Sequence, residues 1–499
     1  MASEPGARAF IEQVLDSGSW VPWDDPEPTL ADVPDDYRAA LARARQETGL
    51  TEAVLTGEGR IAGRRVAVLA GDFGFLGGSI GVATAERLLL AMERATREAL
   101  PLLVAPASGG TRMQEGTLAF LQMVKITDAV AAHRAAGLPY LVYLRHPTTG
   151  GVLASWGSLG HVTLAQPGAL IGFLGPRAYE AIRGEAPPDG VQSAENLHKH
   201  GLIDAVVPAE ELAETIERVL NVACAPHPVG VRPPAPYGSV PDVSAWESIQ
   251  RTRRADRPGV RDLLRATALD VVHLHGSLEG DVDEGVVLAL ATFGGLPCVV
   301  VGHDRSGPAL FRSALRVGRR GMRLARELRV PLLTVIDTPG AALSPEAEEE
   351  GVASAIAHSL LDLVRLDAPT VSVVLGQGAG GAALALLPAD RVLCAQHGWV
   401  SPLPPEGASA IVHRTPDHAP EVAAAQGVRS LDLLRHGIVD RVVPELPDAA
   451  EEPESFLDRM GLAIEYELAS VLVTDPVSRL TARRARYRNL GRETLTSDT

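Results

Sequence analysis

The sequence predicts an α/β protein built from two tandem copies of one domain. Three observations support this prediction: the chain contains an internal repeat, each copy alternates strand patterns with helical patterns, and a proline-rich segment separates the copies. Strands that alternate with helices and glycine turns are typical of layered α/β folds, in which helices cover a largely parallel sheet.

The internal repeat consists of motifs that recur in the same order at nearly constant spacing. PLLVAPASGG (101–110) resembles PLLTVIDTPG (331–340). GLPYLVYLRHPTTGG, ending at Gly151, resembles DAPTVSVVLGQGAGG, ending at Gly381, and HGLIDAVVP resembles HGIVDRVVP further along. Self-similarity at a fixed offset indicates duplicated structural units, so two homologous domains of about 200 residues are expected.

Composition places the boundaries of these domains. The segment 226–242 holds six prolines, which prevent helices and sheet ladders and mark a linker. The cap should contain short helices over 7–18 and 34–49, and the basic stretch TARRARYRNLGRE near the C-terminus should form an exposed helix. The predicted parts are an N-terminal helical cap (1–55), a first repeat (56–225), a Pro-rich linker (226–245), a second repeat (246–445) and a C-terminal helical tail (446–499).

Within each repeat the strands and helices follow from local pattern. The runs LLVA, LVYL, LLTVI and VSVVL are short, apolar and bounded by Gly or Pro, as buried strands are. Helical spacing then places sets of residues on one face, which we expect to pack inward. These sets are Phe120, Met123, Val124, Thr127, Val130 and Ala131 in the first repeat, and Val352, Ile356, Ser359 and Leu363 in the second.

Composition also argues against several classes of function. The 499 residues include 46 Lys and Arg against 62 Asp and Glu, a net charge of −16, which argues against nucleic acid or an anionic membrane as the main partner. Cys224, Cys298 and Cys394 form no CxxC pair, so neither a disulfide framework nor a thiolate metal site is expected and a reducing cytoplasm fits. The N-terminus lacks a signal-peptide pattern, and the apolar runs are too short to span a bilayer.

Each repeat contains two glycine turns between a predicted strand and a predicted helix. The first turn comprises 107–112, or 337–342 in the second repeat, and the second turn comprises 148–153, or 378–383. Glycine lets a ligand approach the main chain, and N–H groups at a helix start have no acceptor within the helix. Two such turns side by side should direct two N–H donors at one point and stabilise a negative oxygen.

Other interpretations of the glycine turns are weaker. A Gly-Gly pair after a strand is also a common packing device, although four instances at matching places favour a functional role. A phosphate-binding loop does not fit, because the sequence holds no GxxxxGKS/T motif and FGFLGGSIG (73–81) lacks the lysine.

At these motifs the chain resembles the carboxyltransferase component of biotin-dependent acyl-CoA carboxylases, which has a crotonase-like fold. The first repeat resembles the β subunit of bacterial acetyl-CoA carboxylase through GDFGFLGGSIG, SGGTRMQEG and HPTTGGVLAS. The second resembles the α subunit through VIDTPGA, EEEGVASAIAHSL, GQGAGGAALAL and SPLPPEGASAI. The resemblance covers about residues 7–225 and 250–445 and implies two tandem crotonase-like ββα-superhelix domains.

The resemblance implies a reaction and its site residues. The family moves CO₂ from N1 of carboxybiotin to the α-carbon of an acyl-CoA such as acetyl-CoA, and both partners form an enolate that needs an oxyanion hole. The acyl-CoA enolate is expected at Gly109, Gly110, Gly150 and Gly151, and the biotin oxygen at Gly340, Ala341, Gly380 and Gly381. Phe75, Gly77, Gly78, Arg112, Gly378 and Ala379 are expected to bind the cofactor or CoA, and Arg112 has the equal alternative of a salt-bridged helix start.

The sequence also bears on the base and on the partners. The six residues after Gly151 and after Gly381 contain no carboxylate. This absence is expected if the biotin that has lost its CO₂ takes the α-proton. Neither Lys125 nor Lys199 lies in a biotinylation motif, so carboxybiotin should arrive on a biotin carboxyl carrier protein charged by a biotin carboxylase. The family also implies a homo-oligomer. Zinc is not expected, because the four-cysteine ribbon of the β subunit is missing.

One departure from the family leaves two alternatives open. Where the family has tyrosine, proline and glycine after Pro-Gly-Ala, this chain reads GAALSPEAEEEG (340–351), so the acyl group is not fixed by the resemblance. A biotin-independent malonyl-thioester decarboxylase of the same fold and a non-catalytic scaffold of a carboxylase complex are the alternatives. A hydratase or isomerase is disfavoured because the acids it needs are absent.

Overall fold

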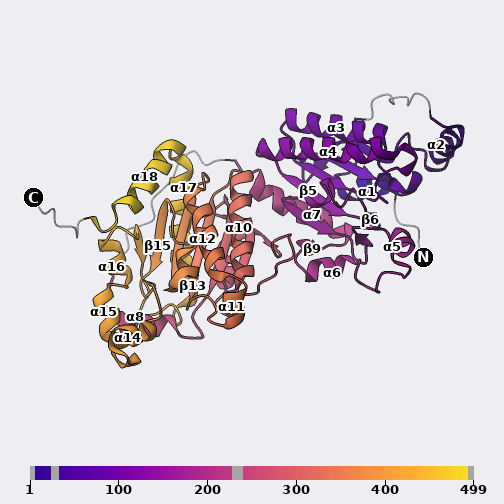
Figure 1. The fold of residues 1–499 in the computed structure, drawn as a ribbon. Coiled ribbons are helices and arrows are strands. Elements are labelled where there is room, and N and C mark those ends of the chain that lie inside the picture. Colours follow the sequence, from indigo (N-terminus) through magenta and orange to yellow (C-terminus); the bar gives the residue numbers. More distant parts are fainter. Residues whose placement is uncertain (1–5, 24–32, 227–239, 493–499) are drawn as a thin grey trace, which may run out of the picture. The chain divides into compact units, whose positions relative to one another are not determined.

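The computed structural model of the chain describes residues 6–23, 33–226 and 240–492, which fall into two compact units (Figure 1). Unit 1 lies within Met1–Ala223 together with Leu278–Gly280, and unit 2 within Cys224–Ser277 and Asp281–Thr499. Most of the expected linker, and short parts of the expected cap and tail, lie outside the described residues.

Unit 1 is organised around one sheet with the strand order β1-β2-β3-β4-β5-β7-β9. β1, β2 and β3 are antiparallel neighbours, and the pairs from β3 to β9 are parallel, while β6 and β8 form a separate parallel pair. The strands are β1 (Val21–Pro22), β2 (Val54–Ile61), β3 (Arg64–Gly71), β4 (Leu102–Ala105), β5 (Tyr140–Leu144), β6 (Thr148–Thr149), β7 (Val162–Ala165), β8 (Ile171–Gly172) and β9 (Ala205–Val206). The helices are α1 (Ala7–Val14), α2 (Asp35–Thr48), α3 (Val82–Arg97), α4 (Gly116–Ala135), α5 (Pro176–Arg183), α6 (Ala194–Lys199) and α7 (Ala209–Ala223), with the 3₁₀ helices η1 (Leu76–Gly78), η2 (Met113–Glu115) and η3 (Trp156–Ser158).

Unit 2 repeats this plan with the strand order β10-β11-β12-β13-β14-β15-β17, and β16 pairs with the end of β14. β10, β11 and β12 are antiparallel neighbours, and the later pairs are parallel. The strands are β10 (Ala268–Leu274), β11 (Val286–Phe293), β12 (Leu296–His303), β13 (Leu332–Thr338), β14 (Thr370–Ala379), β15 (Arg391–Ala395), β16 (Trp399–Ser401) and β17 (Arg441–Val443). The helices are α8 (Ala245–Thr252), α9 (Val260–Thr267), α10 (Arg312–Glu327), α11 (Pro345–Glu349), α12 (Val352–Arg365), α13 (Gly380–Leu384), α14 (Pro405–His413), α15 (Ala419–Gln426), α16 (Ser430–Arg435), α17 (Pro453–Val473) and α18 (Pro476–Asn489), with the 3₁₀ helix η4 (Pro416–His418).

The duplicated topology places the glycine turns at equivalent strand ends. A two-residue hairpin joins β2 to β3 in unit 1, at Ala62–Gly63, and β11 to β12 in unit 2, at Gly294–Gly295. In unit 1 the helices that follow β3 and β4, α3 and α4, lie side by side (Figure 1). In unit 2 the same holds for α10 and α12, which follow β12 and β13. Both expected cap helices are present as α1 and α2.

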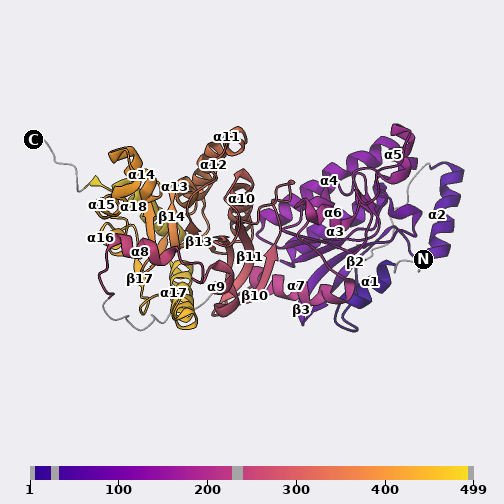
Figure 2. The same cartoon turned by 90° about the horizontal axis from the view of Figure 1, so that it is seen from below.

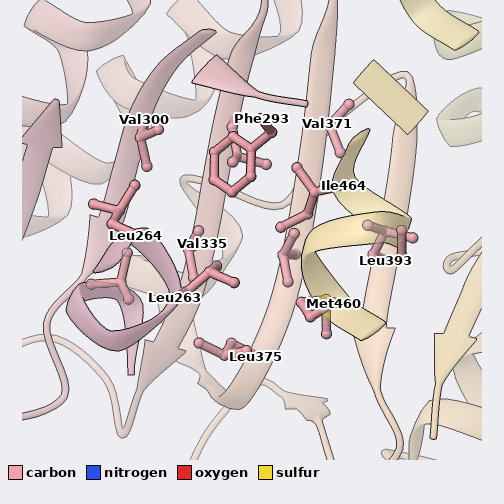
Figure 3. Close-up of a cluster of buried hydrophobic side chains, with 14 of the residues drawn as sticks. Leu263, Leu264, Phe293, Val300, Val335, Val371, Leu375, Leu393, Met460 and Ile464 are labelled. Atoms are coloured by element: carbon pink, nitrogen blue, oxygen red, sulfur yellow. The ribbon is translucent and has the colours of Figure 1, made fainter. Parts of the chain in front are cut away.

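The core of unit 2 lies between the sheet and the helices α9 and α17, which run along the same face (Figure 2). Leu263 and Leu264 of α9 and Met460 and Ile464 of α17 point at the apolar side chains of the central strands (Figure 3). Strands buried on both faces need continuous apolar runs, which explains the burial of every residue of β11, β12 and β13. α17 therefore belongs to the core of unit 2.

The inward face predicted for α4 is partly wrong, whereas the face predicted for α12 is confirmed. Met123 and Val130 are buried, but Phe120 and Val124 are exposed by 60% and 68%. α4 is apolar nearly all round, so periodicity does not reveal which side packs on α3. No helix in the described part of the chain has the length and apolarity needed to cross a bilayer.

The basic C-terminal helix is exposed over most of its length, as expected, and two buried arginines anchor it to unit 2. Arg479 of α18 donates to Asp390 Oδ2 at 2.7 Å, and Arg483 donates to Thr370 Oγ1 at 2.8 Å. Both side chains are almost fully buried. The physical reason is that Asp390 is itself buried and needs charged partners.

Candidate active site

The first glycine turn of unit 1 follows β4 and uses most of its main-chain donors internally. The Gly109 N–H donates to the Gly77 carbonyl at 2.8 Å, and the Gly110 N–H to Ser108 Oγ at 3.0 Å. The Ile80 N–H donates to the Gly110 carbonyl, and the Ile80 carbonyl accepts from the Arg112 N–H. In this parallel bridge the Thr111 N–H points away from Ile80. In the described part of the chain, the Thr111 N–H has no acceptor.

The second turn of unit 1 lies directly against the first. The Gly150 N–H donates to the Phe173 carbonyl at 3.1 Å, whereas the Gly151 N–H meets no acceptor among the described residues. A Cβ on Gly110 would lie 3.3 Å from the Gly151 nitrogen. Gly110 (φ 106°) and Gly150 (φ 67°) both occupy the left-handed region that glycine tolerates.

The structure therefore corrects which amides are open in unit 1. The N–H groups of Gly109, Gly110 and Gly150 have partners, and those of Thr111 and Gly151 do not. Thr111 was not among the expected residues, because its side chain gives no signal and its role follows from the bridge to Ile80. A Cβ on Gly151 would lie 3.2 Å from Thr111 Oγ1, so the two residues are neighbours.

A helix was expected after the second turn, but unit 1 has none there. Hydrogen-bonded turns follow Gly151 and lead into η3, and the Ser155 Oγ donates to the Gly151 carbonyl at 2.5 Å. Serine hydroxyls compete for main-chain acceptors in this way and interrupt helices. In unit 2, where AALALL follows Gly381, the expected helix is present as α13.

The turns of unit 2 repeat this layout. The Gly340 N–H (φ 128°) donates to Thr338 Oγ1 at 3.1 Å, and the Ala342 N–H donates to the Leu310 carbonyl. Leu310 and Ala341 thus form a parallel bridge like that of Ile80 and Thr111 in unit 1. The Ala341 N–H points away from Leu310 and has no acceptor among the described residues. Gly381 is the second residue of α13, where the N–H has no acceptor within the helix.

Buried ion pairs fix the strand ends that carry these turns in unit 2. Asp337, beside the first turn, accepts from Arg305 at 2.9 Å and from the Gln377 N–H at 3.0 Å. Arg257 donates to the Leu375 carbonyl at 3.0 Å.

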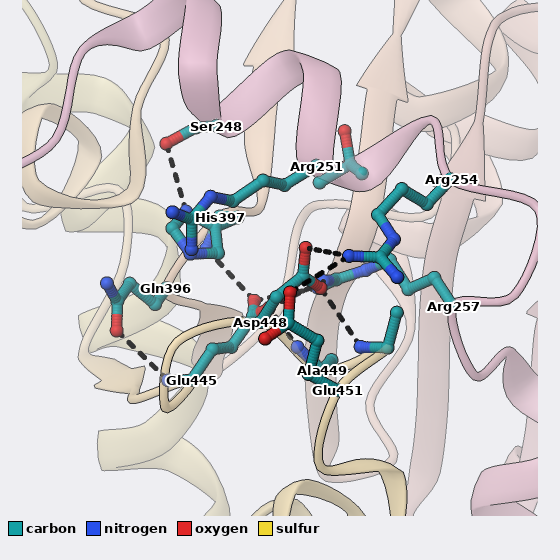
Figure 4. Close-up of polar contacts among 12 residues, drawn as sticks. Ser248, Arg251, Arg254, Arg257, Gln396, His397, Glu445, Asp448, Ala449 and Glu451 are labelled. Carbon is teal, nitrogen blue, oxygen red and sulfur yellow. Dashed lines mark hydrogen bonds and ion pairs between the residues drawn. The ribbon is translucent and has the colours of Figure 1, made fainter.

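Arg257 also forms a fully buried ion pair with Glu445, whose oxygens accept further N–H groups (Figure 4). These contacts connect β13 and β14 immediately before both turns. They are positioned to hold the main chain rather than to touch a ligand.

The residues expected to bind the cofactor or CoA lie within the turns or pack against them. Phe75 is fully buried, and Arg112 is fully buried with both terminal nitrogens on Glu52, so neither side chain can reach CoA in this structure. Of the two roles considered for Arg112, the salt bridge is the one observed. Gly77 accepts the Gly109 N–H. A side chain on Gly78 would overlap the Ala107 carbonyl, and one on Gly378 would lie 2.5 Å from the Trp399 carbonyl oxygen, while Ala379 is buried.

No group of three or more His, Cys, Asp or Glu residues within the described ranges is arranged to bind a metal ion.

Comparison with known proteins identifies the family of this chain. The carboxyl transferase domain family matches residues 7–479. The probable biotin-dependent acyl-coenzyme A carboxylase beta3 subunit of Mycobacterium tuberculosis is 58% identical over 484 residues, covering 96% of this chain and 97% of that protein. The acetyl-coenzyme A carboxylase carboxyl transferase subunits beta/alpha of Salinispora arenicola are 38% identical, with 97% and 90% covered.

Solved structures support the fold. Transcarboxylase 12S, solved as a hexamer with methylmalonyl-coenzyme A bound, matches with a TM-score of 0.69 at 22% identity, over 91% of this chain and 90% of that chain. The expected crotonase-like α/β fold is thereby confirmed. The family model matches most of the chain, and both relatives align with nearly all of it. Together with the duplicated turns, these matches show that this chain belongs to the carboxyl transferase domain family.

Proposed function

We propose that this chain transfers a carboxyl group from carboxybiotin, carried on a separate protein, to the α-carbon of an acyl-CoA such as acetyl-CoA. The observation that carries the proposal is the repeated pair of open main-chain amides, Thr111 with Gly151 in unit 1 and Ala341 with Gly381 in unit 2. A reaction that develops negative charge on two oxygens needs two sets of donors, and the duplicated fold supplies both.

The donors fit the groups assigned to them. We assign the acyl-CoA thioester oxygen to the Thr111 and Gly151 amides, and the ureido oxygen of biotin to the Ala341 and Gly381 amides. Each pair takes one amide from each turn of its unit, and the neighbouring amides of Gly110, Gly150 and Gly340 are already bonded, so the turns are held in place before the substrate arrives. Donors fixed in this way stabilise charge without reorganisation during the reaction.

The environment of the first turn is consistent with a reaction that takes no base from the chain. Glu115, the carboxylate nearest the turn in sequence, accepts from the Tyr37 hydroxyl at 2.5 Å and from the Val82 N–H at 2.6 Å, so both oxygens are engaged. Bound carboxybiotin supplies the carboxyl group and, after its departure, an acceptor for the α-proton. The chain's own contribution is to position both substrates and stabilise their oxygens.

An exposed apolar surface beside the first turn supports assembly into a homo-oligomer. Met113, Leu118, Leu121 and Val124 are all more than half exposed, and three of them lie on α4. Apolar patches of this kind mark interaction sites, and transcarboxylase 12S forms a hexamer. We propose that a second copy of this chain covers this surface, and that the biotin carrier and biotin carboxylase are separate partners.

The decisive experiment removes one amide N–H by comparing two variants that both add a Cβ at the same position. Gly381→Pro and Gly381→Ala both place a Cβ 2.8 Å from Ile356 Cδ1, a side-chain end that can move, but only proline removes the N–H. Proline is also tolerated in the first turn of a helix. In a malonyl-CoA decarboxylation assay with biocytin as acceptor, proline should lower kcat about 10²-fold more than alanine.

The same assay separates the alternatives. Turnover of malonyl-CoA without biocytin would identify the decarboxylase. Absence of turnover with malonyl-, methylmalonyl- and longer carboxyacyl-CoAs in the presence of biocytin would refute the carboxyltransferase. Equal activities of the proline and alanine variants would remove the Gly381 amide from the mechanism. Relative rates across the acyl series will identify the substrate.

A further inference from the structure

Arg112 follows the open Thr111 amide and is fixed by a buried ion pair with the N-terminal part of the chain. Its Nη1 and Nη2 donate to Glu52 Oε1 and Oε2, both at 2.8 Å, and Nη2 also donates to the Ser79 carbonyl at 2.7 Å. The exposed fractions of the Arg112 and Glu52 side chains are 0% and 2%. A two-point contact between a planar guanidinium and a carboxylate fixes both position and orientation.

A second contact closes the network from helix α2. The Tyr37 hydroxyl donates to Glu115 Oε1 at 2.5 Å, and Arg112 Nη1 lies 3.4 Å from the same hydroxyl. Burial and the bond to Glu115 raise the pKa of Tyr37 to about 12, so the hydroxyl stays protonated at neutral pH. Thr84 donates to Glu52 Oε2 at 2.6 Å, which occupies the carboxylate further.

The network controls the main chain that carries the Thr111 amide. The Arg112 N–H donates to the Ile80 carbonyl at 2.9 Å, so this residue is held through both its backbone and its side chain. Thr111 is thereby held between the Gly110 carbonyl, which Ile80 binds, and the anchored Arg112. Any shift of Arg112 moves the adjacent peptide units and redirects the Thr111 N–H.

Glu52 and Tyr37 lie in the part of the chain that has no sequence counterpart in the second repeat. There the equivalent turn is held by the Arg305–Asp337 pair, in which the carboxylate is beside the turn and the arginine comes from the preceding strand end. The two units therefore hold equivalent turns with different residues. This difference shows that the Glu52 network is a device of unit 1.

We propose that Glu52 and Tyr37 are positioning residues, which act through Arg112 and Glu115 to aim the Thr111 amide at the thioester oxygen. This inference rests on the proposed carboxyltransferase function. Because the residues touch the turn and not the substrate, their loss should lower kcat and leave KM nearly unchanged. Misplacement of a reacting geometry by about 1 Å costs about 10²-fold in rate.

Three variants of the full chain test the proposal in the malonyl-CoA and biocytin assay. Glu52→Gln should lower kcat about 10²-fold, and Glu52→Asp should restore part of the loss because the charge returns. Tyr37→Phe removes one hydroxyl from a folded network and should lower kcat about 10-fold, less than Glu52→Gln because Arg112 keeps Glu52. All three should change KM by less than about threefold.

Tyr143→Phe is the matched control. It also removes a buried hydroxyl, which donates to the Val207 carbonyl at 2.9 Å and not to Glu52, Arg112, Glu115 or Tyr37. This variant should keep the wild-type kcat. A fall in kcat equal to that of Tyr37→Phe would show that general loosening of the unit is sufficient and would overturn the proposal, as would wild-type kcat for Glu52→Gln.

Trypsin cleavage after Arg112 provides a readout that does not depend on activity. The buried Arg112 side chain should protect this bond in the wild type, although Met113 beside it is 81% exposed. Glu52→Gln should release the loop and accelerate cleavage there at least 10-fold, measured by mass spectrometry. An inactive wild type would refute the proposed function. Unchanged cleavage in Glu52→Gln would refute the anchoring of Arg112 by Glu52, whether or not the wild type is active.

Discussion

Replacing Gly150 by alanine perturbs the contact between the two turns of unit 1. Gly150 has φ 67°, and a Cβ there would lie 3.2 Å from the Gly110 Cα and 3.3 Å from the Gly109 carbonyl oxygen. Both are main-chain atoms, which cannot rotate away as the end of a side chain can. Alanine should therefore push the first turn, with its Thr111 amide, away from the second.

A control with the same strain and no contact is available in the same unit. Gly168 also has φ 67°, and a Cβ there would meet nothing within 4 Å. Left-handed strain costs about 1–2 kcal/mol at either position, and crowding of packed atoms adds about 1–3 kcal/mol. We therefore expect Gly168→Ala to lower the free energy of unfolding by about 1–2 kcal/mol, and Gly150→Ala by about 2–5 kcal/mol.

Activity should separate the two variants further than stability does. Gly150→Ala should lower kcat in the malonyl-CoA and biocytin assay about 10²-fold, because it displaces oxyanion donors, and Gly168→Ala should keep the wild-type rate. Denaturant unfolding measures the stability difference on the same preparations. Equal rates for the two variants would refute the assignment of the turns to the active site, and equal stabilities would refute the contact between them.

Three other predictions concern stability, thiols and metals. Glu445→Gln should cost about 3–5 kcal/mol, because it leaves the buried Arg257 without its charge partner. Burial opposes ionisation of Glu445, but the bond and charge of Arg257 outweigh it and hold the pKa of this carboxyl below its ordinary 4.5. The stability it supplies is present above pH 4.5 and is lost as pH falls through the folded-state pKa, so acid unfolding should lose this component in the variant. Burial raises the pKa of the Cys298 and Cys394 thiols, so a thiol reagent should label the half-buried Cys224 first in the folded chain, and rapid native labelling of all three would contradict the structure. Activity should survive chelator treatment; loss that zinc restores would contradict a metal-free reaction.

The sequence predicted the duplicated α/β architecture and the place of the four glycine turns. Repeated motifs and buried-strand runs are local signals, and positive φ at Gly110, Gly150, Gly340 and Gly380 explains why glycine stands at the turns. The sequence did not predict the packed face of α4, because a helix that is apolar on several sides does not indicate which side meets a neighbour.

The identity of the open amides was decided only by the tertiary structure. The N–H groups of three of the four expected glycines in unit 1 donate to the Gly77 carbonyl, Ser108 Oγ and the Phe173 carbonyl. Gly77 and Phe173 come close to the turns only after folding. Local sequence by itself determined where the chain turns, since backbone dihedral limits act within a few residues. The N–H groups that remain open to a ligand depend on which acceptors the fold brings close from distant parts of the chain. These acceptors are in place only in the folded molecule.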